Sequence, residues 1–254
     1  MDVGLRFASF GEEKKNTLFI IHKGPLCILN IDGGKGKAIS QLEILCDVMH
    51  RLKMTHYANE STKEVLPYEA FDLMGGCDTG GLIVIMLARL QMSAEETRTE
   101  FIKLCDEIFD VRALTPSNRS ALLRKALGDL LARKDIPLDT KLNDGREDKK
   151  CPGFVVVLPR SSLTGNVVLR TYNSRIAPSS LVTILDAALA TCASQPEFQP
   201  VTISEGSNVH EEYLSAITGA ANPVHTVLTE AFHYFPTGST VSTVVSFGCG
   251  YPFI

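Results

Sequence analysis

Short runs of β-branched and aliphatic residues alternate along the chain with longer stretches in which apolar residues recur every three or four positions. The short runs predict strands over residues 17–22, 26–31, 71–74, 154–158, 167–171 and 241–247. The longer stretches predict helices over residues 40–52, 82–90, 93–109, 118–133, 179–193 and 224–232. Strands that alternate with helices are typical of an α/β fold with a mainly parallel sheet.

Local signals refine this pattern. Ser93 and Glu96 form a capping box at the start of one helix, and Pro223 suits the first turn of another. Residues 82–90 are apolar on every side, which predicts a buried helix. Residues 136–150 are polar and contain glycine and proline, which predicts an exposed loop. No linker is evident, so we expect a single domain over residues 1–254.

Composition and charge exclude several classes of function. Hydrophobic residues make up 44% of the chain, enough to bury a full core. The formal net charge is −4, and without a basic excess we expect no nucleic-acid partner. No apolar run reaches the roughly 18 residues that cross a bilayer, and the N-terminus lacks the apolar region of a secretory signal. The seven cysteines are odd in number and include no C-x-x-C pair, which indicates reduced thiols in a cytoplasmic protein and no zinc site. The sequence indicates no metal and no organic cofactor.

A glycine-rich loop follows the second predicted strand and leads into a predicted helix. It consists of Gly33, Gly34, Lys35, Gly36 and Lys37. Neither G-x-x-x-x-G-K-[ST] nor G-x-G-x-x-G fits this loop, which argues against a nucleotide phosphate loop. Backbone N–H groups at the start of a helix attract anions, so we predict an anion-binding loop here.

A second glycine-rich turn, Gly76-Cys77-Asp78-Thr79-Gly80, lies between a predicted strand and the buried helix. The spacing matches the nucleophile elbow G-x-S-x-G, in which the glycines allow a strained turn to project the central side chain. Here the central residue is Asp78. We expect Cys77 to point away from the site into packing and the N–H group of Thr79 to point into it.

The loop and the elbow belong to a longer pattern. Residues 27–34 and 71–81 are similar to the D-G-G-G-x-R-G loop and the F-D-x-x-x-G-T-S-T-G-G elbow of the patatin-like phospholipase family. Further pieces resemble that family in the same order, at residues 154–157 with 169–172, 187–196, 213–223 and 246–250. The fungal intracellular members of the family are the most similar. The resemblance implies a three-layer α/β/α sandwich and a lipid acyl hydrolase site with a Ser–Asp dyad and an oxyanion loop.

The sequence departs from the family where the chemistry should lie. The nucleophilic serine aligns with Asp78 and the catalytic aspartate with Ser215, so the dyad positions are exchanged. No aspartate occurs after Asp186 that could restore the base. Lys35 replaces the third glycine of the oxyanion loop, where a left-handed backbone would cost about 1 kcal/mol. Lys37 keeps the charge of the family's arginine.

These departures predict little or no phospholipase activity by the family mechanism. A carboxylate nucleophile would give a mixed anhydride instead of a useful acyl-enzyme. We expect the N–H groups at the helix start to lower the pKa of Asp78 and keep it anionic, in the position of a developing oxyanion. Lys35 and Lys37 are candidates to neutralise Asp78 or to hold an anionic head group.

Three interpretations stay open. The first is a degenerate patatin-like protein that binds a lipid or another hydrophobic small molecule without turnover, with Asp78 and Ser215 hydrogen-bonded to each other. The second is a repurposed enzyme of isomerase, cyclase or lyase type that uses Asp78 as acid, base or nucleophile, with His210 or His225 as a candidate base. The third is a lipid acyl hydrolase with a reversed dyad, in which Ser215 is the nucleophile. Peripheral contact with a membrane is compatible with all three.

Overall fold

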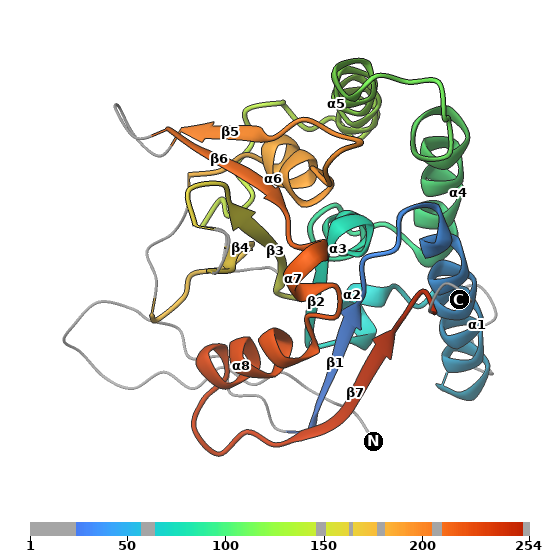
Figure 1. Ribbon diagram of the computed structural model, residues 1–254. Coiled ribbons are helices and arrows are strands. Elements are labelled where there is room, and N and C mark those ends of the chain that lie inside the picture. The colour runs from blue at the N-terminus through green and yellow to red at the C-terminus, as the bar shows by residue number, and fades with distance from the viewer. Residues whose placement is uncertain are drawn as a thin grey trace.

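Figure 1 shows the computed structural model of the chain, which describes residues 24–56, 64–145, 151–162, 165–176, 181–204 and 210–250. The strands are β1 (Leu26–Ile31), β2 (Leu73–Cys77), β3 (Gly153–Pro159), β4 (Val167–Arg170), β5 (Val201–Ser204), β6 (His210–Ser215) and β7 (Val241–Phe247). They form one sheet with the order β5-β6-β3-β2-β1-β7, and β4 also pairs with β3.

The centre of this sheet is parallel, and its edge beyond β3 is antiparallel. Strand β1 pairs in parallel with β2 and β7, and β2 pairs in parallel with β3. Strands β4 and β6 both run antiparallel to β3, and β5 runs antiparallel to β6. Val156 is opposite Cys77 of β2, and the next residue, Val157, is opposite Ser215 of β6. Val157 pairs with β4 along the opposite edge of β3. Strand β6 therefore lies along the same edge of β3 as β2, just beyond the end of β2.

Helices cover both faces of the sheet (Figure 1). One face packs against α8 (Val224–Tyr234) and the short α7 (Ile217–Ala220), which follows Ser215. The opposite face carries the remaining longer helices, which are α1 (Ala38–His56), α3 (Asp78–Val84), α4 (Ala94–Leu104), α5 (Pro116–Arg133) and α6 (Ile184–Thr191). A single turn, α2 (Pro67–Ala70), precedes β2. The predicted three-layer α/β/α architecture with a mainly parallel central sheet is therefore confirmed.

The alternation of side chains along the strands divides the core into two parts. Leu26 and Ile28 of β1 pack on the α8 side, whereas Leu29 and Ile31 pack on the side of α1 and α3. Residues 82–88 of the helix predicted at 82–90 are buried as expected, whereas Arg89 and Leu90 are partly exposed. The helix begins earlier than predicted, at Asp78, and every residue of α3 is buried. Helix α3 continues into a π-helical turn, Ile85–Arg89, before the chain leaves the core.

Several predicted boundaries are correct and others need correction. The predicted bounds of β1 and β7 agree with the structure, and the Ser93 hydroxyl caps α4 by accepting a hydrogen bond from the Glu96 N–H. The strand predicted at 71–74 lies instead at 73–77, and α3 begins directly after it at Asp78. Strands β5 and β6 were not predicted.

The strand predicted at 17–22 lies outside the described residues. The predicted helix start at 179–180 and the predicted loop residues 146–150 also lie outside them. Helix α6 begins at Ile184, where the Thr183 side chain caps it. Within the predicted loop, residues 137–139, 141 and 145 are exposed as expected, whereas Leu142 is buried. None of the helices in the described part of the chain is long and apolar enough to cross a membrane.

Candidate active site

Asp78 lies at the junction of β2 and α3 in a left-handed backbone conformation. Its φ is +50°, a region that disfavours residues with a side chain. A Cβ at Gly76 would lie 2.6 Å from the carbonyl oxygen of Gly80, and one at Gly80 would lie 2.3 Å from the carbonyl oxygen of Ile31. Both positions therefore require glycine, because the strand, the helix and the end of β1 approach each other this closely. The predicted elbow geometry is present.

The glycine-rich loop after β1 packs directly against this elbow. A Cβ at Gly33 would lie 2.8 Å from the Cβ of Asp78. Lys35 begins a 3₁₀ turn, Lys35–Lys37, and has a φ of +52°, so the position where the family has glycine does adopt a left-handed backbone. The Lys35 N–H donates a hydrogen bond to Asp78 Oδ2 at 3.4 Å.

Strand β6 brings Ser215 to the same place. Its register on β3 sets Ser215 next to the end of β2, and the Ser215 Oγ donates a hydrogen bond to Asp78 Oδ1 at 3.3 Å. The N–H of Ile217 in turn donates to the Ser215 Oγ at 3.4 Å. Asp78 is 1% exposed and Ser215 is 4% exposed. The predicted contact between Asp78 and Ser215 is thus present, between residues 137 positions apart in sequence.

Burial dominates the ionisation of Asp78. Removal from water raises the pKa of the Asp78 carboxyl group above its usual value. The N–H groups of Thr79 and Lys35, the Lys35 charge and the Ser215 hydroxyl lower this pKa, but they do not outweigh the loss of hydration. The prediction that the helix start would lower the pKa of Asp78 is therefore wrong, because it considered the hydrogen-bond donors without the depth of burial.

Four backbone donors of the loop are engaged within the protein. The acceptors are the Ala221 carbonyl for the Gly33 N–H, Thr79 Oγ1 for the Gly34 N–H, Asp78 Oδ2 for the Lys35 N–H and the Gly34 carbonyl for the Lys37 N–H. Gly36 packs so closely against Asp110 that a Cβ would lie 2.4 Å from its carboxylate. The carboxyl group to which a backbone N–H of the predicted anion-binding loop donates is the protein's own Asp78.

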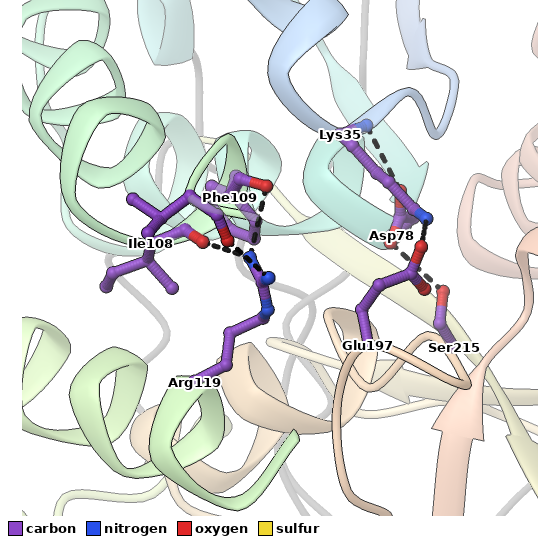
Figure 2. Close-up of polar contacts among 8 residues, drawn as sticks. Lys35, Asp78, Ile108, Phe109, Arg119, Glu197 and Ser215 are labelled. Atoms are coloured by element: carbon purple, nitrogen blue, oxygen red, sulfur yellow. Dashed lines mark hydrogen bonds and ion pairs between the residues drawn. The ribbon is translucent and has the colours of Figure 1, made fainter. Parts of the chain in front are cut away.

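The side chain of Lys35 points to a residue that sequence analysis missed. Its Nζ lies 2.5 Å from Glu197 Oε1, and this ion pair lowers the pKa of Glu197. Figure 2 draws the contacts of Lys35 with Glu197 and Asp78 and the contact between Ser215 and Asp78. Lys35 therefore contacts Asp78 through its backbone and Glu197 through its ammonium group. No motif or spacing in the sequence links Glu197 to this site.

The neighbours of Asp78 in the elbow have structural contacts. Cys77 is fully buried, and its thiol donates to the Ala221 carbonyl at 3.1 Å, which agrees with the prediction that it points into packing. Burial raises the pKa of the Cys77 thiol well above its usual value. The Thr191 hydroxyl of α6 donates to the carbonyl of Asp78 at 3.1 Å, which ties the elbow to a second helix.

The candidate histidine bases lie elsewhere. His210 is at the opposite end of β6 from Ser215, with its Nδ1 2.8 Å from the Ser204 Oγ, and His225 is an exposed residue at the start of α8. Within the described ranges, no cluster of three or more His, Cys, Asp or Glu side chains is arranged to hold a metal ion.

Comparisons with known proteins add little to this geometry. No family model and no curated protein matches the sequence. Among solved structures, the fold is similar to VipD from Legionella pneumophila, with a TM-score of 0.44 and 14% sequence identity. The match covers 75% of this chain and 46% of VipD, so the aligned part spans less than half of that protein. The patatin-like interpretation therefore rests on the sequence motifs and the elbow.

Proposed function

We propose that this chain is a degenerate patatin-like protein that binds a lipid or another hydrophobic ligand and does not hydrolyse esters. The observation that supports the proposal is the position of the Asp78 carboxyl group, which accepts hydrogen bonds from the Thr79 and Lys35 N–H groups. In a hydrolase with this elbow, such donors would stabilise the oxyanion of the transition state. Here a resident side chain already occupies them.

Ser215 is a poor replacement for the missing nucleophile. Its hydroxyl donates to Asp78 and accepts from the Ile217 N–H, which holds it against the carboxyl group. The loop donors point at Asp78, on the other side of the pair. A reversed dyad would therefore lack the Lys35 donor at the place where an oxyanion on a Ser215 adduct would form.

The proposed ligand class follows from the resemblance to lipid acyl hydrolases. One surface feature suits it. Helix α8 presents Leu228 and Phe232 outward, 42% and 81% exposed and one helical turn apart. Apolar side chains on an exposed helix face favour contact with a lipid surface or an apolar molecule.

The test compares fatty-acid release from a panel of phospholipid vesicles by the wild type and by the double variant Asp78→Ser/Ser215→Asp, with each single substitution as a control. We expect no release by the wild type and activity, if any, only in the double variant. Wild-type turnover in the range of ordinary enzymes, roughly 1–10³ s⁻¹, would refute the proposal. Lipid extraction and mass spectrometry of the purified wild type test binding, and failure to retain any lipid of the panel would contradict it.

A second candidate function is acid–base chemistry by Asp78. The raised pKa keeps a proton on this carboxyl group at higher pH than on an exposed aspartate, and a protonated carboxyl group can act as a general acid. Under this alternative, Asp78→Asn abolishes turnover of a substrate found by metabolite screening. Under the first proposal, the same variant leaves ligand binding intact.

A further inference from the structure

Lys35, which contacts the buried Asp78 through its backbone N–H, also forms an ion pair with Glu197, to which the proposed function assigns no role. We propose that Lys35 and Glu197 form a latch that closes the path from solvent to Asp78 and Ser215. The inference concerns access to the site, so it is independent of whether the site binds a ligand or turns one over.

The first argument is position. The Lys35 N–H contacts Asp78 at 3.4 Å, and the Lys35 Nζ contacts Glu197 at 2.5 Å, so one residue joins the buried group to the ion pair. The side chains of Lys35 and Glu197 are 40% and 37% exposed, whereas Asp78 and Ser215 are almost completely buried. Lys35 thus joins a half-exposed ion pair to the buried pair, and Figure 2 draws both of its contacts.

The second argument is that the two halves of the latch belong to separate parts of the chain. Lys35 is in the loop after β1, and Glu197 is in the connection between α6 and β5. The next residue, Phe198, is buried, with the Arg119 guanidinium 5.7 Å from its ring centroid, and the Gln199 N–H donates to a serine of α5. Since the Glu197 half is anchored, opening requires only that the Lys35–Glu197 contact breaks and that the Lys35 side chain swings away.

The third argument is that the closed state leaves one polar atom without a partner. Glu197 Oε2 is buried and has no hydrogen-bond partner among the described residues. An unsatisfied buried acceptor costs free energy, and a half-exposed ion pair contributes little. Breaking the contact would let water reach both carboxylate oxygens.

The experiment measures access with a thiol at the buried position. Ser215→Cys is made in the full chain, and its modification by methyl methanethiosulfonate is followed by peptide mass spectrometry. Adding Glu197→Gln is expected to speed modification by about fivefold, the upper end of what a half-exposed ion pair contributes. Adding the swap Lys35→Glu/Glu197→Lys is expected to restore slow modification.

A matched control exists in the same protein. Lys134 Nζ lies 2.5 Å from Glu96 Oε1, with side chains 27% and 42% exposed, so Glu96→Gln breaks a similar ion pair away from the site. We expect no change in the modification rate at position 215 from this variant. Cys105 is buried elsewhere in the core and reports on global opening in the same digest.

Equal rates with and without Glu197→Gln would overturn the proposal, as would an equal increase from Glu96→Gln or a parallel increase at Cys105. Failure of the charge swap to restore slow modification would also overturn it. If Ser215→Cys does not fold, amide hydrogen exchange of residues 33–37 replaces the thiol. Faster exchange of this loop in Glu197→Gln than in the wild type supports the latch, and unchanged exchange contradicts it.

Discussion

The substitution Gly80→Ala tests the elbow, because the end of β1, strand β2 and helix α3 approach one another closely around this residue. An added Cβ would lie 2.3 Å from the carbonyl oxygen of Ile31 and 2.4 Å from that of Asp32. Both obstacles are backbone atoms at the end of a central strand, so no side chain can turn aside to relieve the clash. Forcing a group into such a packed position costs about 1–3 kcal/mol. We expect Gly80→Ala to lower the free energy of unfolding by at least that amount.

Gly128 provides the matched control within the same chain. It lies inside α5, and a Cβ there would meet only the Leu138 Cδ2 at 3.7 Å, an ordinary contact distance. In a helix interior alanine is more stable than glycine by about 0.5–1 kcal/mol, so Gly128→Ala should stabilise the protein. Urea unfolding followed by far-UV circular dichroism measures both variants, since the chain has no tryptophan to serve as a fluorescent probe. If Gly80→Ala were as stable as the wild type, the elbow would not have this geometry and the argument for the site would fail.

Three further predictions concern the ionisation of Asp78, a buried hydrogen bond of Tyr172 and the reactivity of the cysteines. Burial raises the pKa of the Asp78 carboxyl group. The favourable contribution of this group to the free energy of unfolding is therefore complete below its unfolded pKa of about 3.9 and is lost as the pH rises through its folded pKa. Asp78→Asn should therefore be more stable than the wild type at pH 8, with the difference narrowing towards pH 4 in urea titrations. Tyr172→Phe removes a buried hydrogen bond of 2.7 Å to the Glu230 carboxylate and should cost about 1.5–3 kcal/mol in the same assay. Cys27 and Cys249, the two partly exposed thiols, should react first with a thiol reagent under native conditions, and simultaneous reaction of the five buried cysteines would contradict this burial pattern.

Strands and helices with strong local signals could be predicted from the sequence. The β-branched run of β7 and the aliphatic run of β1 have the predicted bounds, and the capping box at Ser93 marks the start of α4. The strand β6 was missed because its six residues, HEEYLS, carry two glutamates and a histidine and show no apolar alternation. Its extended form is stabilised by antiparallel pairing to β3 and β5, which the local sequence does not encode.

The candidate site, like the fold, could be predicted only in part from the sequence. The contact between Asp78 and Ser215 could be predicted from the sequence, because the motif that contains each residue corresponds to a known position in the fold that it resembles. The direction of the Asp78 pKa shift did not follow, because it depends on how deeply the folded chain buries the carboxyl group. Glu197 could not be found because its contact with Lys35 joins residues 162 positions apart through a single pair of flexible side chains.

The exchange of serine for aspartate at the elbow changes what the backbone donors do. The N–H groups of Thr79 and Lys35 point at one place, and in a hydrolase that place receives a charge that exists only in the transition state. Under the proposed function, the resident carboxyl group uses the same donors at all times, so that they stabilise the folded state instead of a transition state. Asp78→Ser alone would free the donors but leave no base, since Ser215 cannot take up a proton as a carboxylate does. Recovery of hydrolysis therefore requires both substitutions together, and activity from Asp78→Ser alone would show that another group in the site acts as the base.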